Sequence, residues 1–286
     1  MNPLFLRIPA TTRRMNFSLW GAALLCLFCC GVSRARESEV RLLSGTEQNG
    51  VWGTQDFQVN INALGLVRHV KVYDKEVVWQ AAALYTSPVP PDGAAGFRTV
   101  QGEGLGNRGL CIEQPRMTTR AESGARIFEF DILVANTNVL AGQPLCKVSQ
   151  KLTVTPNGEI HVAYDFEWLQ TLRWNGFGLL IIFTKAQCKG RDYMVIMSDQ
   201  IMAGKLDPGP AAECQIRFKR FKQLTVRPEI GPVHLVWDAE ANCSLSWGGG
   251  QPELRVNPLS HPYRGFMYKG QKDRIAYRIL LPVSQQ

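Results

Sequence analysis

Hydrophobic and polar residues alternate along much of the chain, and the clearest stretch is 151–183. Residues 151–155 alternate as Lys-Leu-Thr-Val-Thr, and Pro156-Asn157-Gly158 then interrupts the pattern. Asn-Gly accepts the positive φ angles that a tight hairpin turn needs. The alternation resumes after the turn, and residues 177–183 are almost wholly apolar. We therefore expect a β-hairpin, followed by a strand that is buried on both faces.

Side chains within residues 160–168 fall into two sets, because successive residues of a strand point to opposite faces. The apolar set is Ile160, Val162, Tyr164, Phe166 and Trp168, and the other set is His161, Ala163, Asp165 and Glu167. A strand with one face on a core and one face outward has this pattern.

Similar short strands recur at regular spacing through the rest of the chain. The expected strands are 39–53 with a turn, 57–62, 67–73, 77–79, 126–134, 146–154, 193–198, 215–226 with an irregularity between Phe218 and Phe221, 233–238, 243–247 and 274–281. Residues 87–109 are rich in Pro and Gly and predict a long surface loop or a series of turns without a regular element, and 80–85 is the best short helical candidate. The pattern predicts an all-β protein, a large antiparallel β-sandwich with few or no helices.

The first 35 residues have the features of an export signal peptide. Arg7, Arg13 and Arg14 precede an apolar stretch over 19–30, which is too short to cross a bilayer comfortably, and small residues at 33 and 35 suit cleavage after Ala35. Retention as an N-terminal anchor is the alternative. We expect an exported, periplasmic or extracellular protein in which residues 36–286 form a single domain without a membrane span.

The net charge of the chain says little about its partners once residues 1–35 are removed. This segment contains four arginines and no acidic residue, so the formal charge of +8 falls to +4. Four basic residues, at 217, 219, 220 and 222, share one expected strand, and a solvated strand face is the usual meaning of such a cluster. An acidic polysaccharide is the alternative partner, and nucleic acid is not expected for an exported chain.

Five cysteines follow residue 35, namely Cys111, Cys146, Cys188, Cys214 and Cys243. Export permits disulfides, but an odd number leaves at least one thiol unpaired. A bridge between Cys188 and Cys214, which flank the segment between two strands, is the pairing we predict. The wide spacings and the four histidines give no zinc-site pattern, so no metal is expected.

Three features resemble the galactose mutarotase-like supersandwich group, which includes aldose epimerases and domains of polysaccharide lyases and glycosidases. They are the strand, glycine turn and strand over 57–78, the stretch 156–169 followed by Phe177-Gly178-Leu179, and Lys269-Gly270-Gln271-Lys272 before the last strand. The resemblance implies a supersandwich fold and a sugar-related role. The usual His-Tyr-Phe-Asn stretch has no match here, since His261-Pro262-Tyr263 departs after the histidine, so no epimerase residues are transferred.

Asp165 and Glu167 are the candidate acid–base pair, with His161 further along the same strand face. Residues two apart in a strand lie roughly 7 Å apart, a spacing that paired carboxylates of glycosidases also use. One carboxylate could protonate a leaving oxygen while the other activates water. A polar outer strand face is the alternative interpretation.

Tryptophans are the candidate sugar-binding residues, because the apolar C–H faces of sugar rings stack on indole. Trp168 and Trp237 fall in phase with core residues. Trp174 lies in a connection beside Arg173 and Asn175, and Trp247 precedes three glycines. The remaining binding candidates share the last major loop and are His261, Tyr263 and Arg264.

Three functions stay open at this stage. The sequence favours an exported carbohydrate-binding protein; the alternatives are a carbohydrate-active enzyme and a structural protein of the cell envelope whose aromatic residues all lie in the core. Catalytic motifs such as GxSxG and HExxH do not occur. Residues 102–106, Gly-Glu-Gly-Leu-Gly, lack the flanking strand and helix of a dinucleotide loop, so no cofactor is expected.

Overall fold

Alternating burial builds the fold seen in a computed structural model of the chain. In β10 (Glu159–Trp168), Val162, Tyr164 and Phe166 are buried, whereas Asp165 between them is exposed. The preceding β9 (Pro144–Val154) alternates in the same way and pairs antiparallel with β10. The predicted hairpin is confirmed, and Gly158 in its turn has a φ of +78°, which glycine adopts without strain.

The structure describes residues 39–88, 98–100, 110–136, 144–206, 216–248, 250–259 and 266–283, without the side chains of 84–88, 98–100, 110–114, 135–136, 172–177, 216, 247–248 and 257–258. Residues Glu37–Gln285 form one compact unit. The other elements are β1 (Arg41–Thr46), β2 (Asn49–Gly53), β3 (Phe57–Ile61), β4 (Val67–Val72), β5 (Lys75–Pro88), β6 (Arg98–Val100), β7 (Leu110–Glu122), β8 (Ala125–Asn136), β11 (Leu172–Phe183), α2 (Lys185–Cys188), β12 (Asp192–Met197), β13 (Ile201–Lys205), β14 (Ile216–Val226), β15 (Val233–Gly248), β16 (Gln251–Pro258), β17 (Phe266–Met267) and β18 (Lys272–Leu280).

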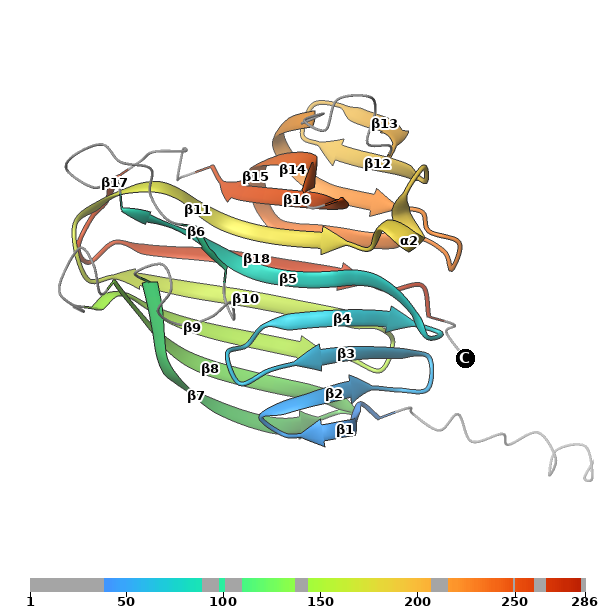
Figure 1. Cartoon of the computed structure of the whole chain (residues 1–286), viewed down its shortest axis with the longest axis horizontal. Helices are drawn as coiled ribbons and strands as arrows, with labels where there is room; N and C mark the ends of the chain where they lie inside the picture. Colours follow the sequence, from blue (N-terminus) through green and yellow to red (C-terminus); the bar gives the residue numbers. More distant parts are fainter. Residues whose placement is uncertain are drawn as a thin grey trace, which may run out of the picture. The chain divides into compact units, whose positions relative to one another are not determined.

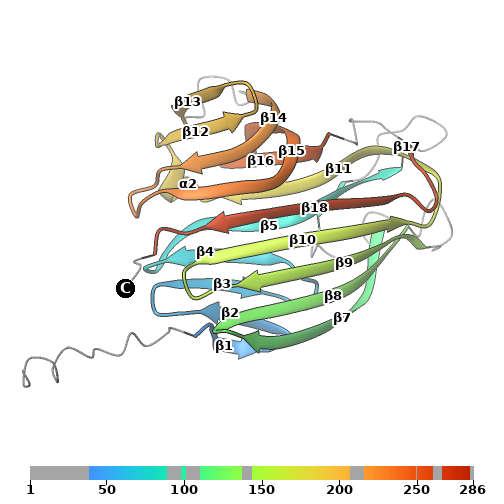
Figure 2. The same cartoon turned by 180° about the vertical axis from the view of Figure 1, so that it is seen from behind.

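Two antiparallel layers face each other across one core. One layer follows the order β7–β8–β9–β10–β18–β15–β14–β12–β13. The other follows β1–β2–β3–β4–β5–β11–β16, and β15 also pairs with β16, so it joins the layers. Figure 1 shows β2 to β5 in front, and Figure 2 shows β7 to β10 and β18 in front. The predicted all-β sandwich is confirmed.

Large aromatic side chains fill the space between the layers. Phe166 stacks between Tyr164 and Trp168, and Trp52 of the opposite layer packs edge-on against Phe128. Fully burying a side chain of this size stabilises the fold by roughly 2–3 kcal/mol. Trp168, with no exposed surface, belongs to the core as predicted, and so does Trp237, which is 7% exposed.

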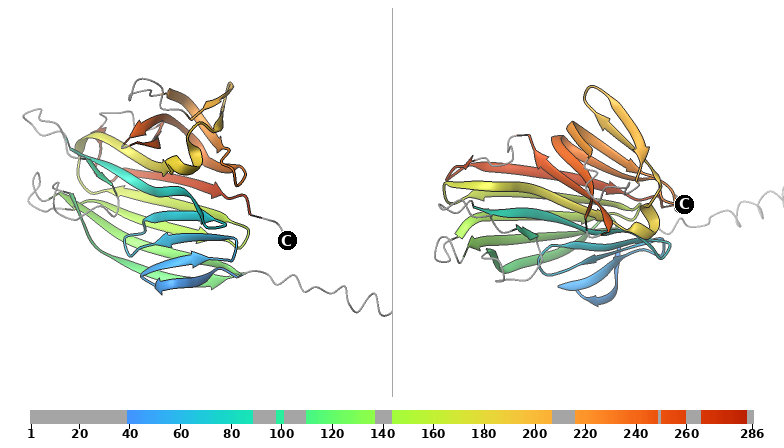
Figure 3. Two further views of the ribbon diagram at one scale, coloured as in Figure 1. Left: turned by 45° about the vertical axis from the view of Figure 1, so that its right-hand side comes forward. Right: turned by 45° about the horizontal axis from the view of Figure 1, so that its top comes forward.

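β15 changes its partner half-way along its length. It pairs with β18 up to Trp237 and with β16 from Ala241 onward, so Asp238, Ala239 and Glu240 form a bend between the two layers. The neighbouring β14 is irregular at the same level, between Phe218 and Phe221, as the sequence predicted. Beyond β14 the hairpin of β12 and β13 projects from the sheet, as both views of Figure 3 show.

Two sequence predictions are corrected. Residues 80–85 are not helical but lie in the middle of β5, because hydrogen bonding to β4 and β11 outweighs the helix propensity of three alanines. The stretch 87–109 was expected to contain no regular element, yet β6 lies within it and pairs with β5. Among the residues that the structure describes, no helix is long and apolar enough to cross a membrane.

Candidate functional site

The three predicted acid–base residues all lie on the outer face of β10. His161, Asp165 and Glu167 alternate with core side chains, and each lies directly opposite a basic residue of β18. The cross-strand pairs are His161 with Arg278, Asp165 with Arg274, and Glu167 with Lys272. Oppositely charged residues in such pairs contribute to the cohesion of a sheet. The outward position of all three residues is as the sequence predicted.

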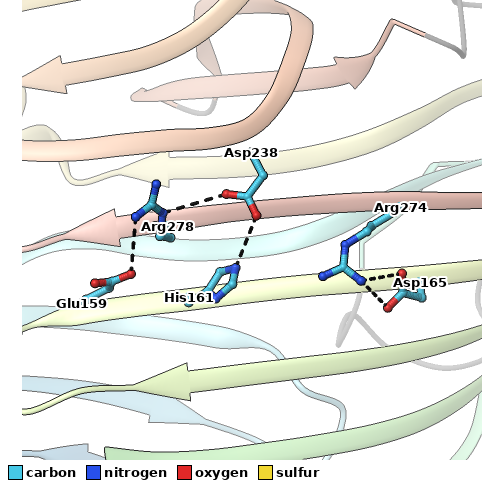
Figure 4. Close-up of polar contacts among 6 residues, drawn as sticks. All are labelled: Glu159, His161, Asp165, Asp238, Arg274 and Arg278. Atoms are coloured by element: carbon cyan, nitrogen blue, oxygen red, sulfur yellow. Dashed lines mark hydrogen bonds and ion pairs between the residues drawn. The ribbon is translucent and has the colours of Figure 1, made fainter.

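Asp165 is held by the arginine opposite it. Both of its carboxylate oxygens lie 2.9 Å from Nη1 of Arg274, which donates to them (Figure 4). The two side chains are 56% and 60% exposed, so the pair itself adds little stability. Its consequence is geometric, because the contact directs both carboxylate oxygens of Asp165 toward Arg274.

His161 belongs to a different group of contacts. Its Nε2 lies 3.6 Å from Oδ2 of Asp238 in the β15 bend, and Oδ1 of Asp238 lies 3.9 Å from Nε of Arg278 (Figure 4). Arg278 also lies 3.9 Å from Glu159. This chain of four side chains ties β10, β18 and β15 together. The histidine is therefore oriented toward β15 and away from Asp165, which lies roughly 13 Å along the strand.

Asp165 and Glu167 share a shallow depression of about 350 Å³ on β9, β10 and β18. Its other charged side chains are Lys147, Lys272, Asp273 and Arg274. The structure thus brings the two predicted carboxylates together but does not place His161 with them. Equal numbers of acidic and basic side chains make this depression a self-compensating charged surface, so a dedicated acid–base pair is not evident in it.

A second depression, of about 270 Å³, lies where β15 leaves β18, and we call it the β15 cleft. Its walls are mostly apolar and include Trp237, Ala241, Val256, Ile275 and Ala276, which are all at most 7% exposed. The charged side chains in its lining are Asp238, Glu240 and Arg274. In the described part of the chain the pairing of β15 with β18 ends at Trp237 and Tyr277, so residues 273–276 of β18 border the cleft beyond that pairing.

Glu240 in the cleft lining is fixed by β14 and the turn before β13. It accepts hydrogen bonds from Arg220, at 2.8 Å, and from Ser198, and Lys222 lies 3.6 Å away. These hydrogen bonds lower the pKa of Glu240 to about 2. Arg220 reaches Glu240 from a left-handed backbone conformation, with φ of +51°, in the irregular part of β14. The predicted basic strand face is exposed, and part of it serves to hold this carboxylate.

No protein-family model and no curated protein matches the chain. Among solved structures, a galactose 1-epimerase from Lactobacillus acidophilus NCFM aligns with a TM-score of 0.45 and 8% identity over 85% of this chain and 97% of its own. An alpha-mannosidase from Enterococcus faecalis V583 gives 0.49 and 8%, over 84% of this chain and 30% of its own. The galactosidase domain of an alpha-galactosidase-sucrose kinase, AgaSK, gives 0.47 and 9%, over 84% of this chain and 41% of its own.

These structures include members of the group that the sequence resembles. The chain spans less than half the length of two of the three proteins. With TM-scores below 0.5, the likeness assigns neither a site nor an activity to this chain, so the functional proposals rest on its own geometry.

Several predicted binding residues lie outside the described part. Arg173, Trp174 and Asn175 belong to β11, but their side chains are not described, and the same holds for Trp247 in β15. Residues His261, Tyr263 and Arg264 are not described at all. Their roles in binding stay predictions, as does the export signal over 1–35.

Three cysteines with described side chains, Cys146, Cys188 and Cys243, are buried free thiols. Cys188 is 1% exposed, and burial raises the pKa of its thiol to about 12. The structure has Cys188 as a free thiol, and its expected partner Cys214 lies outside the described residues. The bridge between them therefore stays a prediction without structural support. Among the described residues, no group of three or more His, Cys, Asp or Glu side chains could hold a metal ion.

Sequence reasoning missed the residues of the β15 cleft. It assigned Trp237 to the core alone and did not single out Asp238, Glu240 or Arg274. A signal was present, because the expected strands ended at 238 and resumed at 243, with Ala-Glu-Ala-Asn between them. That gap is the bend at which β15 exchanges partners, and such exchange points leave space between layers.

Proposed function

We propose that the protein is an exported carbohydrate-binding protein that holds a sugar ring in the β15 cleft. The observation that carries the proposal is the combination of apolar walls, including Trp237 and Ile275, with the charged side chains of Asp238, Glu240 and Arg274. A sugar ring needs this combination, because its C–H faces are apolar whereas its hydroxyls are strong hydrogen-bonding groups.

The charged groups of the cleft are pre-positioned. Asp238 contacts His161 and Arg278, Glu240 contacts Arg220, and Arg274 contacts Asp165. Groups that are already held in place lose less conformational freedom when a ligand binds. The carboxylates can accept hydrogen bonds from sugar hydroxyls, and Arg274 can donate to the hydroxyl or ring oxygens.

The size of the cleft limits the ligand. Its volume of about 270 Å³ is just below the lower end of the usual range for small-molecule sites, which begins at roughly 300 Å³. A monosaccharide, or one sugar unit of a longer chain, is the ligand class that we propose. The export of the protein is supported by the basic and then apolar character of residues 1–35.

A glycan array followed by titration calorimetry tests the proposal. We expect a specific signal from the purified protein, and at least about a tenfold loss of affinity in Arg274→Met, since hydrogen bonds to charged groups contribute roughly 1.5–3 kcal/mol. Lys205→Met is the matched control, because Lys205 also makes an exposed ion pair, with Asp192 on the β12–β13 hairpin. A blank array, or equal losses in both variants, would contradict the proposal.

One observation favours an enzyme as the second candidate. His161 and Asp238 form a histidine–carboxylate pair at 3.6 Å, and Asp238 lines the cleft. Such a pair could move a proton to or from a bound sugar. Polarimetry of reducing sugars would detect anomer interconversion. If His161→Gln loses turnover but still binds sugar, the protein is an enzyme. If the wild type shows neither turnover nor binding, a structural role in the envelope is favoured.

A further inference from the structure

The second layer has an outer face of its own, on the side away from the main core. Alternate residues of β5 and β11 point to it and form a small separate cluster of Ala82, Leu180 and Ile182 together with Leu66. Trp79 packs against this cluster, and the guanidinium of Arg68 lies over its indole ring at 5.5 Å. Apolar and polar side chains therefore meet on this face.

Polar side chains form a row across this face from β4 to β16. Arg68 lies opposite Gln80, Gln80 lies opposite Ile182, and Ile182 lies opposite Glu253. Nη2 of Arg255, two residues along β16, donates to Glu253 at 3.0 Å. Because adjacent strands are roughly 4.8 Å apart, Gln80 and Glu253 are separated by about 10 Å, with Ile182 of β11 between them.

Three N–H donors in this row are buried without a hydrogen-bond acceptor. They are Nε of Arg68, Nε2 of Gln80 and Nε of Arg255. Gln80 is only 1% exposed, so its amide has almost no contact with solvent. Buried polar groups in native proteins are nearly always paired, and those that are not call for a specific explanation. Since all three are donors, the group that would satisfy them must carry acceptor oxygens.

We propose that this row binds a small ligand that carries a carboxylate together with hydroxyl groups, such as a sugar acid. Its oxygens would accept from Gln80, Arg68 and Arg255, and its apolar surface would lie against Trp79. Two arginines and Glu253 give the row one net positive charge, which matches a monoanion. The side chain of Arg255 is 37% exposed, so the row is accessible at its β16 end.

This site is separate from the β15 cleft. It lies on the outer face of the β4–β5–β11–β16 layer, whereas Asp238 and Arg274 of the cleft interact with the outer face of β10. The proposal therefore does not depend on the carbohydrate-binding function proposed for the cleft.

Titration calorimetry with D-glucuronate and D-glucose tests the inference, because the two probes differ in the carboxylate. We expect saturable glucuronate binding that falls at least about tenfold in Gln80→Leu and in Arg68→Met. Arg126→Met is the matched control, since Arg126 likewise lies over a tryptophan, Trp52, at 4.6 Å, but belongs to β8. This control should leave glucuronate affinity unchanged.

Several results would overturn the inference. They are the absence of saturable glucuronate binding, an affinity for glucose equal to that for glucuronate, and full affinity in the Gln80 and Arg68 variants. If Gln80→Leu does not fold, the glucuronate affinity of Arg68→Met tests the inference by itself, because the side chain of Arg68 can be shortened without disturbing the main core. Loss of glucuronate binding in Arg274→Met but not in Arg68→Met would place the anion in the cleft and would also reject the row.

Discussion

The outer faces of the two layers differ in how their polar side chains are paired, although Nε2 of His161 on the β10–β18 face is also buried without a hydrogen-bond partner. On the β10–β18 face, Asp165, Asp238 and Glu240 each have a basic partner, and most of these groups are well exposed. On the β5–β11 face, Nε2 of the buried Gln80 and Nε of Arg68 are buried donors without acceptors. Paired charges on an exposed surface change the stability of the fold little, whereas buried donors without acceptors destabilise it. The difference indicates that the second face is incomplete without another molecule.

The largest expected effect follows from removing the basic partner of a buried carboxylate. Glu253 has a side chain that is 11% exposed and is paired with Arg255. In Arg255→Met the carboxylate would remain buried without its partner. We expect the free energy of unfolding to fall by about 2–3 kcal/mol, less than the roughly 3–5 kcal/mol of a fully buried pair, because the Arg255 side chain is 37% exposed. Urea denaturation measures this value. A loss below about 0.5 kcal/mol would show that Glu253 is hydrated and that the face is more open than its burial suggests.

Two buried glutamines give the next comparison. Nε2 of Gln150, which is 2% exposed, donates to the buried carbonyl of Gly65 at 2.7 Å, whereas Nε2 of Gln80 donates to nothing. Gln150→Leu should lower the free energy of unfolding by about 2 kcal/mol, because it leaves the buried carbonyl of Gly65 without its hydrogen-bond donor. Gln80→Leu should be neutral or stabilising by the same measurement. Equal losses would remove the distinction between the two amides.

The pH dependence of stability tests the paired face. The folded-state pKa of Glu240, about 2, lies below the value of roughly 4.3 for an unfolded chain. Its contribution is therefore fully present above about pH 5 and is lost as the pH falls toward 2. The Tm difference between the wild type and Glu240→Gln should shrink over this range. A difference that stays constant would show that Arg220 and Ser198 do not hold the carboxylate in solution.

The smallest effect is expected for the exposed pair of Asp165 and Arg274. Because both side chains are more than half exposed, Arg274→Met should change the free energy of unfolding by less than about 0.5 kcal/mol. Urea denaturation beside Arg255→Met gives the direct comparison of an open pair with a buried one. A large loss in Arg274→Met would mean that Arg274 supports the apolar wall of the cleft by packing.

Much of the fold was predictable because the period of two is a local property of the sequence. Residues 160–168 alternate strictly, and Asn157-Gly158 fixes the turn before them, so this hairpin could be placed without a structure. Residues 80–85 could not be, because a run of three alanines carries no polar alternation and favours a helix by itself. Only pairing with two flanking strands makes that segment extended.

The candidate sites were less predictable, because they depend on which strands become neighbours. The outward position of Asp165 and Glu167 follows from alternation, but nothing near residue 165 indicates that Arg274, more than a hundred residues later, engages both oxygens. Gln80 and Glu253 are similarly distant in the chain and come within one row through β11. The register between distant strands decides which residues become neighbours, and a single sequence does not reveal that register.

The position of β18 has a consequence for how the protein is made. This strand lies between β10 and β15, although it follows every other described strand in the chain. During synthesis, β10 and β15 would each present an unpaired edge until residues 272–280 are available, and open edges recruit other strands. The central pairings of that layer, between β18 and its two neighbours, are therefore also the last to form. Until they form, the nascent chain is most prone to mispairing of its strands.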